Sequence, residues 1–213
     1  MHIHNISMDT KPAISEAKRT CAIILAGGKG TRFHKQKQFV ELEGKALWEH
    51  VYDKTIKVVD AQDVVVVGVD VEGGRTRSFS VRNGLGHFSQ AYSRVVILEA
   101  ARPLVTEEQI RQLVDSDSDS LTFVAPCVDT IIMRDKTFLN RADCLRLQTP
   151  QAFNFVKLKA AYDTGKYEDM TDETRVMFEE YGIRPSFIDG GDNLMKVTYP
   201  SDIFVLERYI KTD

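Results

Sequence analysis

A short apolar run that leads into a glycine-rich loop constrains the fold of this chain more than any other stretch. The run occupies residues 21–25 (CAIIL), and the loop at residues 26–32 holds three glycines and two cations. Glycine tolerates positive φ and lets backbone N–H groups close around an anion, while lysine and arginine add positive potential. The stretch therefore predicts a buried β-strand that leads into a phosphate-binding turn.

Two common phosphate-binding patterns do not fit this loop. A dinucleotide fingerprint would place a third glycine at the position of Phe33, which is too large for close helix–strand packing. A P-loop needs Gly-Lys-Ser/Thr, whereas Lys29 is followed here by Gly30. Taken alone, the loop is also compatible with an ordinary turn after a buried strand, so the rest of the chain has to distinguish the two interpretations.

The composition is typical of a soluble protein with one globular unit. The 213 residues carry a formal net charge of −3, which lacks the basic excess that nucleic-acid binding demands. Three cysteines without a C-x-x-C pair argue against a disulfide framework and against a zinc site. No apolar stretch of the sequence approaches the roughly 20 residues of a membrane span. We therefore expect a cytoplasmic protein that binds neither nucleic acid nor membrane.

Apolar runs and helical periodicities alternate along most of the chain. Predicted strands lie at 21–25, 64–69, 94–98, 121–126 and 184–188, and predicted helices at 45–59, 76–88, 106–114, 156–162, 172–181 and after Pro200. Thr106, with Gln109 three residues later, forms a capping box at the start of one helix. This alternation predicts an α/β fold with a Rossmann-like, doubly wound, mostly parallel sheet and ligands at the carboxyl ends of its strands.

Two segments depart from the alternation. Residues 1–19 are polar and aperiodic, which predicts a flexible N-terminal tail ahead of one domain at 20–213. Residues 128–150 mix apolar and charged residues without a helical period, which predicts a protruding β-arm. The stretch 148–151 (QTPQ) fits either a functional segment or a rigid turn, because proline fixes φ and keeps the residue before it extended.

Seven separated segments together carry a resemblance to one family. They lie at residues 26–38, 73–85, 99–103, 129–130, 148–153, 171–172 and 196–202. In this order they resemble the 2-C-methyl-D-erythritol 4-phosphate cytidylyltransferases and their ribitol-5-phosphate relatives, over essentially everything after residue 20. The resemblance implies a nucleotidyltransferase domain in which CTP and a polyol phosphate give a CDP-polyol and pyrophosphate. It also implies Mg²⁺ as cofactor and a homodimer with interlocked arms.

The resemblance further implies a role for each matching residue. The nucleotide would contact Ala26, Gly27, Gly28, Gly30, Gly74, Arg75, Ser80 and Ala100. The triphosphate and the reacting phosphorus would be held by the catalytic residues Arg32, Lys37 and Lys196. The acceptor would contact Glu99, Thr130 and Arg141, the last two delivered by the arm of a partner subunit, and Glu99 would also be a ligand of the Mg²⁺.

Several positions depart from the family pattern and leave alternatives open. The path from Arg32 to Lys37 is shorter than usual, so Lys35 could take the role of Lys37, and Glu99 stands where the family has aspartate. We favour 2-C-methyl-D-erythritol 4-phosphate as acceptor, hence a role in isoprenoid biosynthesis. The alternatives are ribitol 5-phosphate or another polyol phosphate for a surface polysaccharide, a UTP- or GTP-dependent transferase, and a non-catalytic nucleotide-binding relative.

Two polar residues in the matching segments have structural interpretations beside the functional ones. Arg102 is expected to brace its own loop by hydrogen bonds rather than to touch substrate. Asp172 is expected to cap the helix that follows it.

Overall fold

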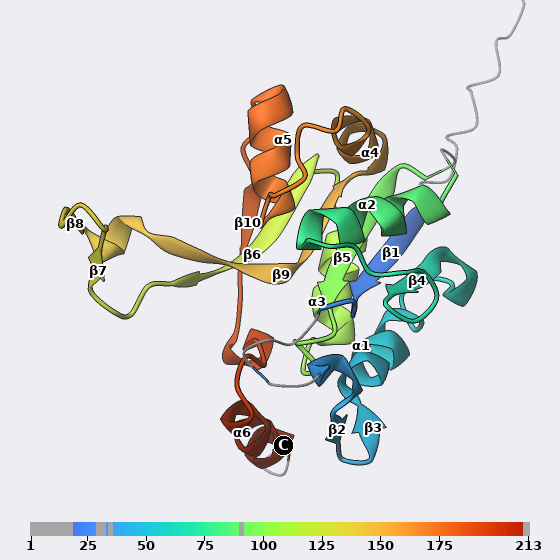
Figure 1. Ribbon diagram of the computed structural model, residues 1–213, viewed down its shortest axis with the longest axis horizontal. Coiled ribbons are helices and arrows are strands. Elements are labelled where there is room, and N and C mark those ends of the chain that lie inside the picture. Colours follow the sequence, from blue (N-terminus) through green and yellow to red (C-terminus); the bar gives the residue numbers. More distant parts are fainter. Residues whose placement is uncertain (1–18, 29–32, 34–35, 90–91, 211–213) are drawn as a thin grey trace, which may run out of the picture.

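A six-stranded sheet forms the centre of the molecule (Figure 1). The computed structural model describes residues 19–28, 33, 36–89 and 92–210. Across the sheet the strand order is β10-β6-β9-β5-β1-β4, with bounds β1 Thr20–Leu25, β4 Val64–Val67, β5 Arg94–Glu99, β6 Ser120–Pro126, β9 Leu145–Asn154 and β10 Ser186–Asp189. All neighbouring strands are parallel except β9, which is antiparallel to both β5 and β6. The predicted α/β fold with a mostly parallel sheet is confirmed.

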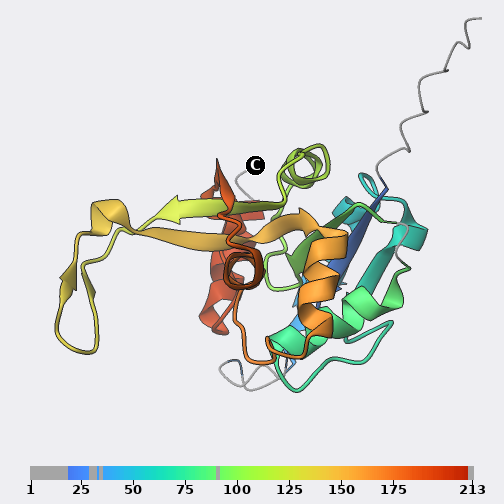
Figure 2. The same cartoon turned by 90° about the horizontal axis from the view of Figure 1, so that it is seen from above.

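Helices cover both faces of this sheet (Figure 2). One face packs against α2 (Arg77–His87), α4 (Phe155–Asp163) and α5 (Glu173–Tyr181), and the other packs against α1 (Leu47–Thr55) and α3 (Glu107–Val114). Side chains of β1 alternate between the two cores, so that Ile23 faces the first and Ile24 the second. Burial on both sides explains why β1 and β4 are continuously apolar.

Local capping signals set the helix boundaries. The Thr106 hydroxyl accepts from Gln109 N at 3.1 Å, while Thr106 N donates to Gln109 Oε1 at 3.0 Å, so the predicted capping box is confirmed. Short 3₁₀ segments occur at Lys37–Phe39, Ala61–Asp63, Arg141–Asp143 and Asp192–Leu194.

Within the described part of the chain, no helix has the length and apolar character needed to cross a membrane.

A small third core sits below the carboxyl ends of the strands. It joins α6 (Ser201–Ile210) and the two-stranded ribbon β2 (Glu41–Leu42) and β3 (Lys45–Ala46) to the main body. Its buried members are Phe33, Leu42, Leu47, Ala101, Val197 and Leu206. Val197 N also donates to Ala101 O at 2.8 Å, so this core brings the chain just before α6 next to the end of β5.

The segment after β6 leaves the body as a long arm with the hairpin β7 (Ile131–Ile132) and β8 (Phe138–Leu139) near its tip (Figure 1). A turn at 148–151 is not formed, because these residues lie within β9, in the middle of the sheet. Thr122 pairs with Gln151 and Phe123 with Gln148, so two residues of β9 bulge out of the ladder there. A bulge tolerates Pro150 inside a central strand, because proline has no N–H to donate.

Candidate active site

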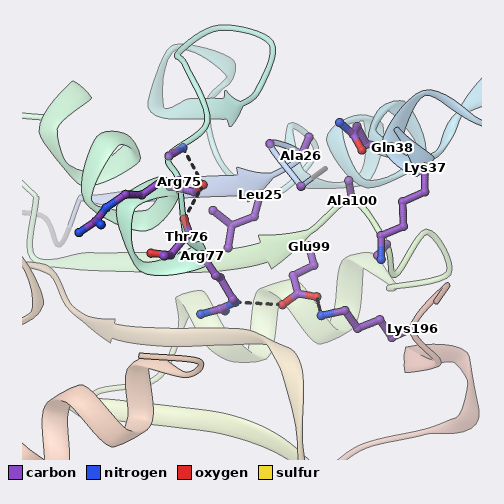
Figure 3. Close-up of a pocket in the computed structure, with 15 residues that line it drawn as sticks. Leu25, Ala26, Lys37, Gln38, Arg75, Thr76, Arg77, Glu99, Ala100 and Lys196 are labelled. Carbon is purple, nitrogen blue, oxygen red and sulfur yellow. Dashed lines mark hydrogen bonds and ion pairs between the residues drawn. The ribbon is translucent and has the colours of Figure 1, made fainter. Parts of the chain in front are cut away.

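A pocket of about 340 Å³ opens at the carboxyl ends of β1 and β5 (Figure 3). Leu25 and Glu99, the last residues of these strands, are direct neighbours across the sheet. The predicted site residues that line the pocket are Ala26, Gly27, Gly28, Lys37, Gly74, Arg75, Ser80, Glu99, Ala100 and Lys196. Segments far apart in the sequence therefore meet at one end of the sheet, where open α/β sheets bind ligands.

The remaining predicted residues fall into two groups. Gly30 and Arg32, together with the alternative Lys35, lie outside the described residues. Thr130 and Arg141 are exposed on the arm and do not line the pocket, and Arg141 Nη1 donates to Val128 O at 2.5 Å. In a single chain, Thr130 and Arg141 therefore lie away from the pocket of that chain.

Glycines let two loops approach each other closely behind the pocket. Gly68, just after β4, has a φ of +104°, and a Cβ placed there would lie 2.7 Å from Gly27 N. A Cβ on Gly27 would lie 2.8 Å from Gly73 Cα. Both distances are shorter than real side chains permit, so only glycine fits. The turn after β1 therefore presents its backbone to the pocket, as a phosphate-binding turn requires.

The start of α2 forms another wall. Thr76 is its N-cap and accepts from Phe79 N at 3.3 Å. The Ser80 hydroxyl accepts from Gly74 N at 3.0 Å and donates to Thr76 O at 3.2 Å, which ties the loop to the helix. The exposed Arg75 pairs with Glu168 at 2.5 Å and stacks over the Phe79 ring. The predicted base and ribose contacts of Gly74, Arg75 and Ser80 remain predictions.

A charged cluster forms the floor of the pocket (Figure 3). Glu99 Oε1 accepts from Arg77 Nε at 3.3 Å, and Glu99 Oε2 pairs with Lys196 Nζ. Burial alone would raise the pKa of Glu99, but the positive charges of Lys196 and Arg77 outweigh it and hold the pKa at about 2. Glu99 is therefore ionised throughout the physiological pH range. Close by, Lys37 Nζ donates to Val197 O at 2.8 Å.

Sequence reasoning selected Arg75 and missed Arg77. Helical spacing could have found it, because Arg77 lies on the same face of α2 as the buried Val81 and Gly84, four and seven residues later. That face is turned toward the sheet, whereas Arg75 precedes the helix and is exposed. Thr76, as the N-cap, fixes where α2 begins and therefore which of its residues face the sheet.

Both residues make the structural hydrogen bonds that were expected of them. Arg102 Nε donates to Thr149 Oγ1 at 2.8 Å, and Arg102 Nη1 donates to Leu194 O, so this arginine ties its loop to β9 and to the segment at 192–194; that it does not touch substrate stays a prediction. Asp172 is the N-cap of α5 and accepts from Thr174 N at 2.9 Å.

The pocket lining does not by itself form a metal site. Among the described residues, no group of three or more His, Cys, Asp or Glu side chains is arranged to hold a metal ion. Glu99 is the single carboxylate among the described lining residues, and each of its oxygens already contacts a cation. Its assignment as a metal ligand therefore stays a prediction.

The Glu99 cluster predicts a pH-dependent stability. Unfolding returns the Glu99 pKa from about 2 to its ordinary value of 4.5, so the unfolded chain binds an extra proton between these values. The stabilisation is complete above about pH 5 and is lost as the pH falls toward 2, at a cost of about 3 kcal/mol. Urea unfolding from pH 6 to pH 2.5 measures it. In Glu99→Gln, the free energy of unfolding should lose this dependence on pH. An unchanged dependence would contradict the assignment of the low pKa to Glu99.

Comparison with known proteins identifies the family. Residues 20–212 match the family model for 2-C-methyl-D-erythritol 4-phosphate cytidylyltransferase. The chain is 34% identical to an enzyme of that name from Thermotoga neapolitana, over 85% of this chain and 92% of the relative. A relative of the same name from Alkaliphilus oremlandii is 32% identical, over 91% and 96%.

The fold comparison agrees with the sequence comparison. The crystal structure of 4-diphosphocytidyl-2C-methyl-D-erythritol synthase from Anaerococcus prevotii superposes with a TM-score of 0.76, covering 91% of this chain and 96% of that one. Its sequence identity is 22%, so this match supports the fold alone. With the family model matched over nearly all of the described residues, the chain belongs to the 2-C-methyl-D-erythritol 4-phosphate cytidylyltransferase family of nucleotidyltransferases.

Proposed function

We propose that this protein transfers the cytidylyl group of CTP to 2-C-methyl-D-erythritol 4-phosphate and releases pyrophosphate. The observation that carries the proposal is the pocket at the ends of β1 and β5, which joins a glycine backbone turn to Lys37 and Lys196. Such a pocket suits a triphosphate, because backbone N–H groups and fixed cations both favour anionic oxygens. Family membership selects CTP and methylerythritol phosphate among the possible substrates.

The reaction needs positioning and charge neutralisation more than covalent help. A phosphate oxygen of the acceptor attacks the α-phosphorus of CTP, and the bond to the pyrophosphate oxygen breaks on the opposite side. Lys196 and Lys37, which line the pocket, would neutralise the charge that develops on the leaving group, and Arg32 is proposed as a third cation. Glu99, held ionised by its two cations, is available to accept a hydrogen bond from the acceptor.

Mg²⁺ is proposed as the cofactor, bound mainly by the triphosphate of CTP. The described residues of the pocket lining supply no metal site of their own, and Mg²⁺ prefers phosphate oxygens and water with at most one or two carboxylates. When bound there, the ion neutralises charge on the phosphates.

A homodimer is proposed because the arm lies away from the pocket of its own chain. The large apolar side chains exposed on the arm are Val128, Ile132, Met133, Phe138, Leu139, Leu145 and Leu147. Contact with a second copy would cover them and would bring Thr130 and Arg141 to the partner's pocket. A cytoplasmic location is also proposed, since Cys21, Cys127 and Cys144 are all unpaired.

The arm proposal predicts a selective defect. Arg141→Ala should raise the KM for the acceptor about tenfold and leave the KM for CTP unchanged, because the arginine would contact the acceptor phosphate alone. Steady-state kinetics with each substrate varied in turn measure both values. Lys136→Asn, at an exposed left-handed position near the arm tip, is the control and should behave as wild type. A raised KM for CTP in Arg141→Ala would contradict the assignment.

Pyrophosphate release from purified protein tests the proposed function. The assay contains Mg²⁺ and one nucleotide, CTP, UTP or GTP, with methylerythritol phosphate, ribitol 5-phosphate or no acceptor. Release with CTP and methylerythritol phosphate alone supports the proposal. Release with ribitol 5-phosphate or another nucleotide would select one of the alternative transferases, and CTP-dependent thermal stabilisation without turnover would identify a non-catalytic relative.

A further inference from the structure

Glu173 is a buried carboxylate beside the pocket that the proposed reaction does not use. It lies in the first turn of α5, has no exposed surface, and is not among the residues that line the pocket. Its two oxygens accept from Arg77 Nη1 at 2.6 and 2.7 Å, and Oε1 also accepts from Tyr162 Oη at 3.0 Å. These two partners of the carboxylate, Arg77 of α2 and Tyr162 of α4, are thus side chains of other helices.

Stability alone does not explain this pair. Replacing a buried ion pair by well-packed apolar residues is often neutral or stabilising, so such a pair is weak evidence for a stabilising role. The neighbouring buried positions of α5, Val176 and Met177, are apolar and pack into the core. Arg77, by contrast, lines the pocket, so its charge lies beside the place where the proposed substrate would bind. The charged pair therefore calls for a different explanation.

Arg77 connects Glu173 to the floor of the pocket. Its Nη1 is held by Glu173. Its Nε contacts Glu99 Oε1 at 3.3 Å (Figure 3). Without Glu173, the two cations Arg77 and Lys196 would share one carboxylate. A guanidinium released in this way pairs strongly with phosphate, frequently through two parallel hydrogen bonds. The incoming triphosphate would then compete with Glu99 for Arg77.

We propose that Glu173 is a positioning residue for the cytidylyl transfer, holding Arg77 on Glu99 and away from the triphosphate. The inference rests on the proposed function and adds a residue from α5 to its site. A released Arg77 would bind the triphosphate equally strongly before and during the reaction, and such a contact does not raise turnover. Glu99 would lose its partner Arg77 and its position, and this would lower turnover. Loss of Glu173 should therefore reduce kcat without weakening CTP binding.

The test compares two glutamates of the same helix. Glu173→Gln sets an amide N–H₂ against the donors of Arg77, and we expect kcat to fall about 30-fold while the KM for CTP is unchanged or lower. Glu180→Gln is the matched control, since Glu180 of α5 likewise accepts from a tyrosine, Tyr167 Oη at 2.6 Å, but lies outside the pocket lining. It should keep the wild-type kcat.

A double-mutant cycle shows whether the effect passes through Arg77. If it does, adding Glu173→Gln to Arg77→Met changes kcat less than twofold further, because the residue it positions is already gone. Losses that multiply, or a kcat of Glu173→Gln within threefold of wild type, would overturn the proposal. A raised KM for CTP in Glu173→Gln would do the same.

Folding and function can be separated in the same experiment. If Glu173→Gln does not fold, Tyr162→Phe replaces it, removing one hydrogen bond to Glu173, with an expected threefold fall in kcat at unchanged KM for CTP. A wild-type kcat in Tyr162→Phe would then overturn the role of Glu173. Wild-type protein that releases no pyrophosphate contradicts the proposed function, whereas an active wild type with an equally active Glu173→Gln contradicts this inference only.

Discussion

Lys196→Ala should lower turnover on the order of 10²–10³-fold, as expected when a cation that stabilises developing phosphate charge is removed. Lys196 pairs with Glu99 and borders the pocket, and its neighbour Val197 accepts from Lys37, so this segment gathers two lysines at the proposed leaving group. The KM for CTP should rise much less than kcat falls, because the charge is largest in the transition state.

Steady-state pyrophosphate release measures both parameters. Lys166→Ala is a suitable control, since Lys166 forms its ion pair with Glu180 away from the pocket and should leave kcat unchanged. The urea midpoint of Lys196→Ala, compared with that of the wild type, shows whether the variant is folded. A folded Lys196→Ala variant with kcat within fivefold of wild type would rule out the proposed role of this lysine.

Gly68→Ala should destabilise the protein by about 3 kcal/mol or more and weaken CTP binding at least tenfold. Two costs add: the φ of +104° is unfavourable for alanine, and the new Cβ would lie 2.7–2.8 Å from backbone atoms of Ala26 and Gly27. Backbone cannot move aside as a flexible side chain can, so the phosphate-binding turn itself must shift.

Urea unfolding and CTP-dependent thermal stabilisation measure the two effects. Gly86→Ala, inside α2, is the matched control because a Cβ there meets no atom within 4 Å. Alanine favours helix over glycine by about 1 kcal/mol, so this control should be neutral or stabilised. Equal stability of the two variants would show that the close approach of the loops does not constrain the turn.

Features encoded over a few neighbouring residues were predictable. The capping box at Thr106, the helix cap at Asp172 and the buried valine strand, predicted at 64–69 and formed at 64–67, depend on local hydrogen bonds and on the side-chain period of strands and helices. The glycine-rich turn after β1 was recognisable for the same reason, because its glycines are consecutive in the sequence; at Gly27 the structure shows that they serve close backbone approach rather than positive φ.

The assembly of the site depended on contacts between distant residues. Insertion of β9 antiparallel between β5 and β6 was not predicted, since strand order is decided by packing and by a bulge that accommodates Pro150. Gly68 meets Gly27, and Glu173 meets Arg77, across separations that no local pattern reports.

The sequence by itself determined the fold class, the glycine-rich turn after β1 and the family, because each follows from short-range patterns or from ordered motifs along the chain. Only the tertiary structure decided which charges face one another at the floor of the pocket. Glu99, Arg77 and Lys196 acquire their pairing, and Glu99 its low pKa, from burial and proximity created when three separate segments meet at the end of the sheet.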